Sequence, residues 1–208
     1  MTTPHVNHDA AVAGAKQRRR NARSHAAIVD ATNQLLIEVG YGQLTIEGVA
    51  ARAGVGKATV YRWWPSKAAL AIEAMSRGLD GRSPAETGDL RQDLLAAVRR
   101  AIHLLARSPE GAIIPALAAD MMRDQALAKQ FREQILLPRR SVVTGIVRRA
   151  VDRGELPANL DIGLLMDVYA GAVFYRVVVS GAPVNEHLAE QLVGLLLDGK
   201  KPLLPDAD

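Results

Sequence analysis

The chain has 208 residues, of which 49% are hydrophobic, so it can bury a core in one mid-sized domain or two small ones. It contains no cysteine, which excludes disulfides, cysteine-ligated zinc fingers and thiol catalysis. The first ten residues show no apolar run after a basic start, so we expect no secretory signal and a cytoplasmic protein.

The net charge of +4 is concentrated at one end of the chain. Residues 1–80 hold ten Lys or Arg and six Asp or Glu, whereas residues 81–208 hold equal numbers of basic and acidic residues. A basic end of this kind is attracted to a polyanion such as DNA. The excess is small, and it supports DNA binding only together with a motif.

Residues 1–22 are polar and basic without hydrophobic periodicity, and they predict a flexible basic arm. Apolar residues then recur at helical spacing, which predicts a helix over 24–39 that Gly40 ends. The arm could enter the minor groove of DNA or neutralise phosphates, and the alternative is a solubilising tail. Its candidate DNA contacts are Arg18, Arg19 and Arg20.

Two short helices follow, joined by a glycine turn. Thr45 is a suitable N-cap for a helix over 46–53, and Gly54 makes the turn because a sharp bend between helices often needs positive φ. The third helix spans 57–64, and Pro65 ends it. This spacing is typical of a helix-turn-helix.

A fourth helix, capped by Ser66, is predicted to run to about residue 79. The segment 81–88 is rich in turn residues and marks a domain boundary. We therefore expect an N-terminal three-helix helix-turn-helix domain over 23–80 and a second domain over 81–208.

The second domain also reads as helical throughout. Pro115 lies in the first turn of one predicted helix, and Pro138 should kink or split another. No period-2 segment is long enough to predict a strand, so the expected fold class is all-α. The predicted helices cover 90–106, 111–122, 125–153, 162–180 and 186–198.

The third helix is predicted to have an inner and an outer face. At about 100° per residue, Val60 at the centre of the inner face places Gly56 and Trp64 beside it. Trp63 lies between core and surface, where it could pack on the DNA backbone or merely cover the domain. The outer face carries Ala58, Thr59, Tyr61 and Arg62.

The outer face suits a helix that enters the major groove of DNA. Ala58 is small enough to let the helix lie deep, Arg62 can read guanine bidentately, and Tyr61 can reach a phosphate. Lys57 and Lys67 each stand at a helix N-terminus, where a cation opposes the helix dipole. A bound phosphate would offset that cost, whereas the alternative is an ordinary solvated lysine.

The stretch TIEGVAARAGVGKATVYRWWPSKAAL, residues 45–70, resembles the DNA-binding domain of TetR-family transcriptional regulators. The resemblance covers about 24–80 and includes the threonine cap, VAxxAGV, K-x-T-x-Y and Pro-Ser-Lys. FREQILLPRR and GLLMDVYAGAVFYR are similar to C-terminal domains in part of the family, whereas many members lack the long basic arm.

The resemblance implies a homodimeric, all-helical repressor that binds a palindromic DNA operator and carries a C-terminal ligand-binding and dimerisation domain. Such a protein would take a small-molecule effector and need no cofactor. The DNA contacts that it implies are Thr45, Lys57, Thr59, Tyr61, Arg62 and Lys67.

The segment 162–180 is apolar nearly all round, and Asp167 and Arg176 within it favour a buried helix over a membrane span. One face can pack on its own domain and the other on a second subunit, together with the last helix. The alternative is a monomer whose core encloses both helices. The predicted interface residues are Tyr169, Ala172, Val173, Val177, Leu188, Leu192, Leu195 and Leu196.

A ligand pocket is expected between the middle helices, although each candidate could equally be plain core packing. The methionines would give an adaptable apolar wall. The candidate lining residues are Ile102, His103, Leu117, Met121, Met122, Phe131 and Tyr169.

The sequence leaves two other functions open besides a ligand-responsive repressor. One is a DNA-binding regulator controlled by a protein partner, which a solid C-terminal core without a cavity would favour. The other is an enzyme with an appended DNA-binding domain. The five histidines form no metal-spaced motif such as HExxH, and no nucleophile motif or carboxylate pair stands out, so we expect no catalytic and no metal-binding residues.

Overall fold

The computed structural model describes residues 8–77, 87–108 and 111–199, and within these ranges every regular element is helical. The all-α prediction is therefore confirmed. The chain divides into two compact units, Met1–Ala74 and Met75–Asp208, which are described separately here. The loop predicted at 81–88 lies mostly outside the described residues.

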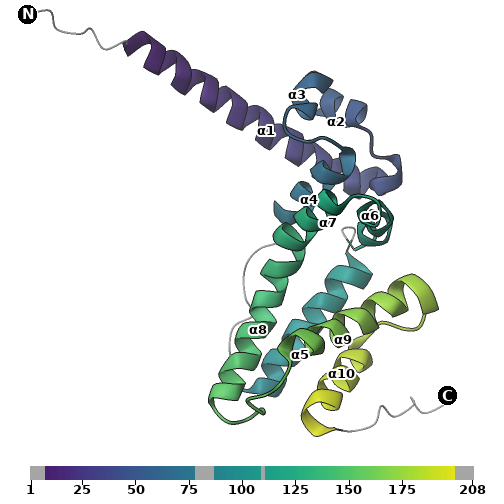
Figure 1. Cartoon of the computed structure of the whole chain (residues 1–208). Helices are drawn as coiled ribbons and strands as arrows, with labels where there is room; N and C mark the ends of the chain where they lie inside the picture. Colours follow the sequence, from purple (N-terminus) through teal and green to yellow (C-terminus); the bar gives the residue numbers. More distant parts are fainter. Residues whose placement is uncertain (1–7, 78–86, 109–110, 200–208) are drawn as a thin grey trace, which may run out of the picture. The chain divides into compact units, whose positions relative to one another are not determined.

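The first unit contains α1 (His8–Gln43), α2 (Ile46–Arg52), α3 (Lys57–Tyr61) and most of α4 (Lys67–Arg77). Figure 1 shows α2 and α3 beside the C-terminal part of α1. The core between these helices is apolar. Its fully buried members are Ile28, Val29, Leu44, Val49, Val60, Leu70 and Ile72.

The predicted start of the first helix at residue 24 is wrong, because α1 begins at His8. Residues 9–22 are rich in Ala, Lys, Gln and Arg, which favour helix. They show no hydrophobic periodicity, which is the signal on which the prediction depends, and residues 15–20 are exposed to solvent. The stop at Gly40 is confirmed, since its φ of 73° and ψ of 171° break the helical path.

The local signals of the helix-turn-helix are confirmed. The Thr45 hydroxyl accepts the Gly48 N–H at 3.1 Å and caps α2. Gly54 has a φ of 64°, as the turn between α2 and α3 requires. The Ser66 hydroxyl accepts the Ala69 N–H at 3.2 Å at the start of α4.

The second unit contains six α-helices and three π-helical turns among the described residues. Pro138, which is predicted to kink or split the helix over 125–153, follows a π-helical turn at 132–136, and residues 125–152 stay on a continuous helical path. The elements are α5 (Leu90–Ile102), η1 (His103–Arg107), α6 (Ile113–Met121), α7 (Gln125–Phe131), η2 (Arg132–Leu136), α8 (Leu137–Asp152), α9 (Ile162–Tyr175), η3 (Arg176–Ser180) and α10 (Glu186–Asp198).

The core of the second unit is built around α5, which packs against α8, α9 and α10. Leu94, Val147, Val173 and Val193 each contribute a fully buried side chain from a different one of these helices. The arrangement explains why apolar residues recur at helical spacing in all four segments.

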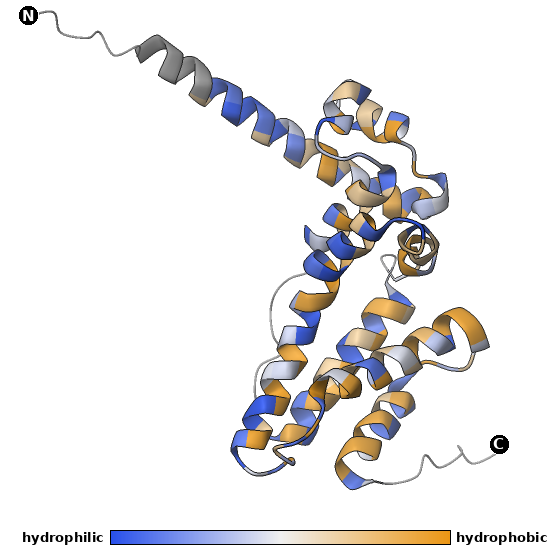
Figure 2. Ribbon diagram, in the orientation of Figure 1, coloured by the Kyte–Doolittle hydropathy of each residue, from blue (hydrophilic) through white to orange (hydrophobic). Residues whose placement is uncertain are grey.

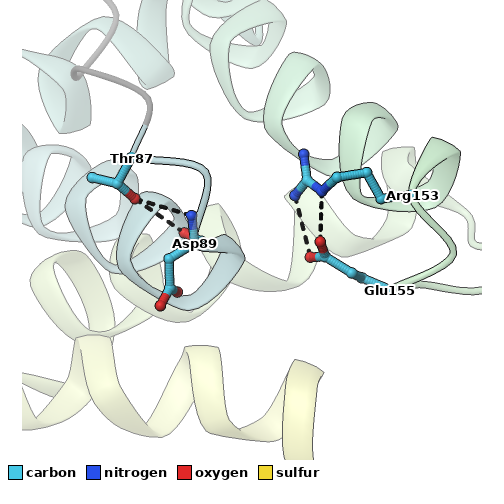
Figure 3. A network of polar contacts seen from close by, with 4 residues as sticks. All are labelled: Thr87, Asp89, Arg153 and Glu155. Atoms are coloured by element: carbon cyan, nitrogen blue, oxygen red, sulfur yellow. Dashed lines mark hydrogen bonds and ion pairs between the residues drawn. The ribbon is translucent and has the colours of Figure 1, made fainter.

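A polar network fixes the start of α5. The carboxylate of Asp89 accepts the Gln92 N–H at 2.9 Å as N-cap, and the Thr87 hydroxyl lies beside the Asp89 backbone (Figure 3). Thr87 also donates to buried Asp93 from its backbone N–H (2.9 Å) and its hydroxyl (2.8 Å). Burial alone would raise the pKa of Asp93, but these hydrogen bonds, with Arg149 nearby, hold it below its ordinary value.

A second pair in the same region closes the turn after α8. Arg153 donates to the Glu155 carboxylate from Nε (2.5 Å) and Nη2 (3.2 Å), as Figure 3 shows. This contact holds the pKa of Glu155 below its usual range. Both side chains are partly exposed, so the pair orders the turn more than it stabilises the unit.

We predict that Asp93→Asn destabilises the second unit by about 1–2 kcal/mol at neutral pH, because asparagine keeps an oxygen acceptor but loses the negative charge that strengthens both Thr87 bonds. A folded-state pKa below the unfolded value stabilises the protein above the unfolded pKa, and this gain is lost as pH falls through the folded pKa. Urea unfolding at neutral and acid pH should therefore show a difference between wild type and variant that shrinks with acid. A difference that is independent of pH would contradict the role of the charge.

Candidate DNA-binding surface and ligand cavity

The recognition helix α3 is held by side chains that point inward. Val60 is fully buried and Trp64 is 2% exposed, as the helical spacing predicts. Ala58, Tyr61 and Arg62 are exposed on the opposite side. Although α3 ends at Tyr61 rather than at the expected residue 64, Arg62 keeps helical dihedrals, so the outer face continues through it.

A group of side chains from α1 and α4 anchors the end of the recognition helix. Trp64 Nε1 donates to Glu73 Oε2 at 2.7 Å, and the other Glu73 oxygen lies 3.1 Å from His25 Nε2. The His25 ring packs against both indoles, with centroids 5.2 Å from Trp63 and 4.7 Å from Trp64. The sequence interpretation missed His25 and Glu73, because nothing in their local pattern indicates a long-range partner.

The two lysines at helix starts both have partners within the protein. Lys57 Nζ lies 3.0 Å from Glu47 Oε1, a contact that raises the pKa of Lys57 and lowers that of Glu47. Lys67 Nζ lies 3.3 Å from the carbonyl oxygens of both Tyr41 and Leu44 and 4.8 Å from the centre of the Tyr41 ring. Lys67 therefore ties the start of α4 to the end of α1, a role that the sequence did not indicate.

The basic residues before the first buried turn of α1 lie on a helix. Arg18, Arg19, Arg20 and Arg23 are exposed, in the hydrophilic stretch that Figure 2 shows along α1. At about 100° per residue, Lys16, Arg19, Arg20 and Arg23 fall within one third of the helix circumference. The helix thus arranges them as a basic stripe.

The second unit contains a cavity of about 1,400 Å³ that is partly open to solvent. Three of the predicted lining residues, His103, Met121 and Phe131, lie on its wall. Ile102, Leu117 and Tyr169 are buried in the core and Met122 is 89% exposed, and none of these four is on the wall. The apolar wall also includes Leu104, Leu105, Ile114, Ile135, Val142, Val143, Met166 and Phe174.

Two π-helical turns border this cavity. His103, Leu104 and Leu105 come from η1, and Gln134, Ile135 and Leu136 come from η2. A π turn widens a helix and is often found at functional sites. Gly111 closes against η1: a Cβ at this position would lie 2.3 Å from the Leu104 carbonyl oxygen, so only glycine fits.

Tyr169, a residue of α9, has an unusual environment in the core. Its side chain is buried, and its hydroxyl makes no hydrogen bond to any group that the structure describes. Burial raises its pKa to about 12. The phenol therefore stays neutral at physiological pH.

An apolar stripe runs along the outer side of α9. Leu164, Val168 and Tyr175 are 61%, 45% and 57% exposed and recur at helical spacing, and Gly171 lies between them. Figure 2 shows α9 as hydrophobic over most of its length. Ile162–Ser180 is long and apolar enough to span a membrane by length and composition, a test that core helices also pass.

The expectation that 162–180 is buried on every side does not hold within one chain, because only 11% of the segment is buried. Of the predicted interface residues, Tyr169, Val173, Leu188 and Leu192 lie in the core of their own unit. Val177 and Leu195 are exposed, and Ala172 and Leu196 pack against that core while remaining partly accessible. Asp167, in mid-segment, pairs with Arg140 at 2.7 Å.

A helix-turn-helix unit with an exposed recognition face, joined in one chain to a helical unit with a cavity, defines a DNA-binding regulator of the helix-turn-helix class. No group of three or more His, Asp or Glu that could hold a metal ion occurs in the part of the chain described.

Comparison with known proteins identifies the family. Residues 28–74 match the model of the bacterial regulatory proteins of the TetR family, and residues 84–196 match the Tetracyclin repressor-like C-terminal domain. The chain belongs to the TetR family of transcriptional regulators.

Relatives and solved structures support the same family. The uncharacterized regulator YdeS of Bacillus subtilis is 34% identical over 85% of this chain and 89% of its own. The DNA-binding transcriptional repressor TetR of Mycobacteroides abscessus is 30% identical over 84% of this chain and 92% of its own. The crystal structure of the TetR-family regulator SCO0332 matches with a TM-score of 0.75 and 36% identity. The match covers 86% of this chain and 99% of the SCO0332 chain. FadR of Bacillus subtilis, solved in complex with stearoyl-CoA, shares the fold with a TM-score of 0.60 and 20% identity. The match covers 85% of this chain and 99% of the FadR chain.

We predict that Glu73→Ala destabilises the first unit by about 1–3 kcal/mol, because Trp64 Nε1 loses its acceptor in a partly buried position. Since the exposed face of α3 is unchanged, any loss of DNA affinity would then come from a misplaced helix. Urea unfolding and DNA binding on the same preparation measure both effects. Glu73→Gln keeps an oxygen acceptor and serves as the control, and equal loss in the two variants would contradict the hydrogen-bond argument.

Proposed function

We propose that this TetR-family regulator is a cytoplasmic homodimeric repressor that binds a palindromic operator and releases it when a small, mostly apolar ligand enters the cavity of the second unit. The observation that carries the ligand half of the proposal is the cavity of about 1,400 Å³, which exceeds the roughly 300–1,000 Å³ usual for small-molecule sites. A relative named as a repressor supports the direction of control.

The DNA-binding half of the proposal rests on the exposed face of α3. Ala58 has the small side chain that allows close approach to a groove, and exposed Arg62 would contact a base edge. Tyr61 is 53% exposed and can donate its hydroxyl to a phosphate. The remaining proposed contacts are Thr45, Lys57, Thr59, Trp63 and Lys67, with Arg19 and Arg20 on the basic stripe and Arg18 on another side of α1.

The proposed dimer uses the apolar stripe of α9 and the exposed side of α10. Leu164, Val168 and Tyr175 cannot all be buried by their own unit, whereas a second copy can cover them. Gly171 lies within this stripe and would allow two helices to approach closely. Val177 and Leu195 from the predicted interface extend the same accessible apolar surface.

Release by ligand requires the ligand to prefer one of two dimer states. In one state the two recognition helices reach successive major grooves, about 34–36 Å apart, and in the other they do not. A ligand that binds only the second state lowers operator affinity by its differential affinity for the two. The cavity favours this mechanism over control by a protein partner, for which a filled core would suffice.

A DNA-binding selection from a random library, with the purified full chain at near-physiological salt, tests the first half of the proposal. We expect one enriched palindrome whose half-sites are separated by about one helical turn or a multiple of it. General binding that weakens with salt and shows no enriched sequence would refute the operator-binding repressor.

Arg62→Ala should relax sequence discrimination by about 1–3 kcal/mol, because it removes the one arginine that α3 offers to a base edge. Arg20→Ala is the matched control, since a phosphate contact from the basic stripe should weaken all sequences alike and flatten the salt dependence. Competition binding against operator and random DNA separates the two. An equal loss of affinity for operator and random DNA in Arg62→Ala would contradict the base-reading role.

Val168→Glu should convert the dimer to a monomer, because it places a charge in the centre of the apolar stripe. Ile37→Glu, which changes a 61% exposed residue of α1, is the control and should remain dimeric. Sedimentation equilibrium measures the oligomeric state directly. An unchanged dimer in Val168→Glu would place the interface elsewhere.

A further inference from the structure

We infer that the cavity is completed by a second subunit, so that a ligand in one subunit also contacts the α9 helix of its partner. This inference rests on the proposed function, in which two copies meet on the apolar stripe of α9 and the cavity takes the effector. It goes further by making the effector site a shared site, which couples ligand binding to dimer formation.

The cavity and the apolar stripe occupy neighbouring faces of α9. At about 100° per residue, the wall residues Asp167, Ala170 and Gly171 fall within about 100° of the helix circumference. The side chains of Leu164, Val168 and Tyr175 take up about the next 60°, and Gly171 lies on the border between the two faces. A helix that packs on the stripe therefore lies at the edge of the cavity.

This edge of the wall is not covered by the subunit that forms it, as far as the described residues show. Asp167, Ala170 and Gly171 are exposed although they line the cavity. A Cβ atom added at Gly171 would meet no side chain and no other helix within 4 Å. An apolar ligand would therefore keep part of its surface in water here, at a cost of about 25 cal/mol per Å².

A second copy of α9 has the shape that this edge lacks. In a two-fold dimer the same surface lies on both subunits, so a gap in one stripe faces the side chains of the other. The stripe supplies both parts, because Gly171 leaves a gap, and Val168 and Tyr175 stand about one turn before and after it. The partner subunit's Val168 and Tyr175 would then lie over Gly171, beside the ligand.

The polar group at this edge does not oppose an apolar partner helix. Asp167 is paired with Arg140 of the same subunit at 2.7 Å, and Arg140 also donates to the Gly163 carbonyl oxygen at 2.9 Å. A carboxylate that is paired in this way costs less to cover than a free charge. The partner helix can therefore close the edge of the cavity beside this ion pair.

A shared site links the effector to the dimer. A ligand that binds the dimer more tightly than the monomer by some factor tightens the dimer by the same factor for each ligand bound. Covering about 60 Å² of apolar surface at this edge is enough for a factor of ten. We therefore expect ligand affinity to differ about tenfold or more between dimer and monomer.

Titration of N-phenyl-1-naphthylamine, a neutral apolar dye, compares the two states of the full-length protein. We expect the Val168→Glu monomer to bind the dye about tenfold or more weakly than the wild-type dimer, and dimeric Ile37→Glu to bind it as wild type does. Circular dichroism and urea unfolding check that Val168→Glu is folded. Wild type diluted below its dimer dissociation constant should show the same loss, which separates loss of the partner from a direct effect of the new glutamate.

Gly171→Leu tests the close approach of the two helices. Within one subunit the added side chain has room, and leucine favours a helix over glycine, so the variant should fold. In the proposed dimer the leucine collides with the partner's stripe, so sedimentation equilibrium should show a dimer dissociation constant raised about tenfold or more. Gly42→Leu is the matched control, because a Cβ also has open space there and Gly42 lies in the first unit.

The possible failures are distinguishable. Equal dye affinity in the wild-type dimer and in both monomer samples would overturn the shared site but leave the effector function standing, because the cavity would then be complete in one subunit. An unchanged dimer in Gly171→Leu would overturn the shared site as well, since the helices would not meet at this point. Absence of dye binding by the wild-type dimer also overturns it. If the operator is insensitive to a broad screen of other small molecules, the ligand-responsive function fails too.

Discussion

A helix of five residues cannot hold its own conformation in water, because helix nucleation costs more than a single turn of hydrogen bonds returns. The recognition helix α3 is such a helix, so the DNA-reading surface exists only where the rest of the unit places it. Val60 and Trp64 fix it from inside, and Glu73 and His25 fix Trp64 in turn. Because Val60 and Trp64 hold the helix from inside, exposed residues such as Ala58, Tyr61 and Arg62 can be specialised for DNA.

The sequence predicted this unit well where the signals are local. The Thr45 cap, the Gly54 turn and the inward direction of Val60 each depend on a few neighbouring residues, and each is confirmed. Contacts across long sequence separations were not predictable in this way. Lys67 was expected either to bind a phosphate or to be an ordinary solvated lysine, yet it lies against carbonyl oxygens more than twenty residues earlier in the chain.

The second unit shows why helical periodicity locates helices but does not assign their faces. An apolar residue can face the core, a cavity or a subunit interface, and the sequence pattern is the same in each case. Tyr169 and Phe131 were both predicted to line the cavity, yet only Phe131 does so, since Tyr169 lies in the core, and its neighbour Val168 is exposed. The π turns decide part of this division because they shift the register of the helix around the cavity, and hydrophobic periodicity does not indicate where they occur.

The chain has two tryptophans, Trp63 and Trp64, and both belong to the anchor of the recognition helix. The unit that contains the cavity has none. Intrinsic tryptophan emission is thus an optical signal from the DNA-binding unit alone. A change in this emission when a non-absorbing molecule enters the cavity would report an effect on the DNA-binding unit, so the unlabelled protein carries its own reporter of communication between its two units.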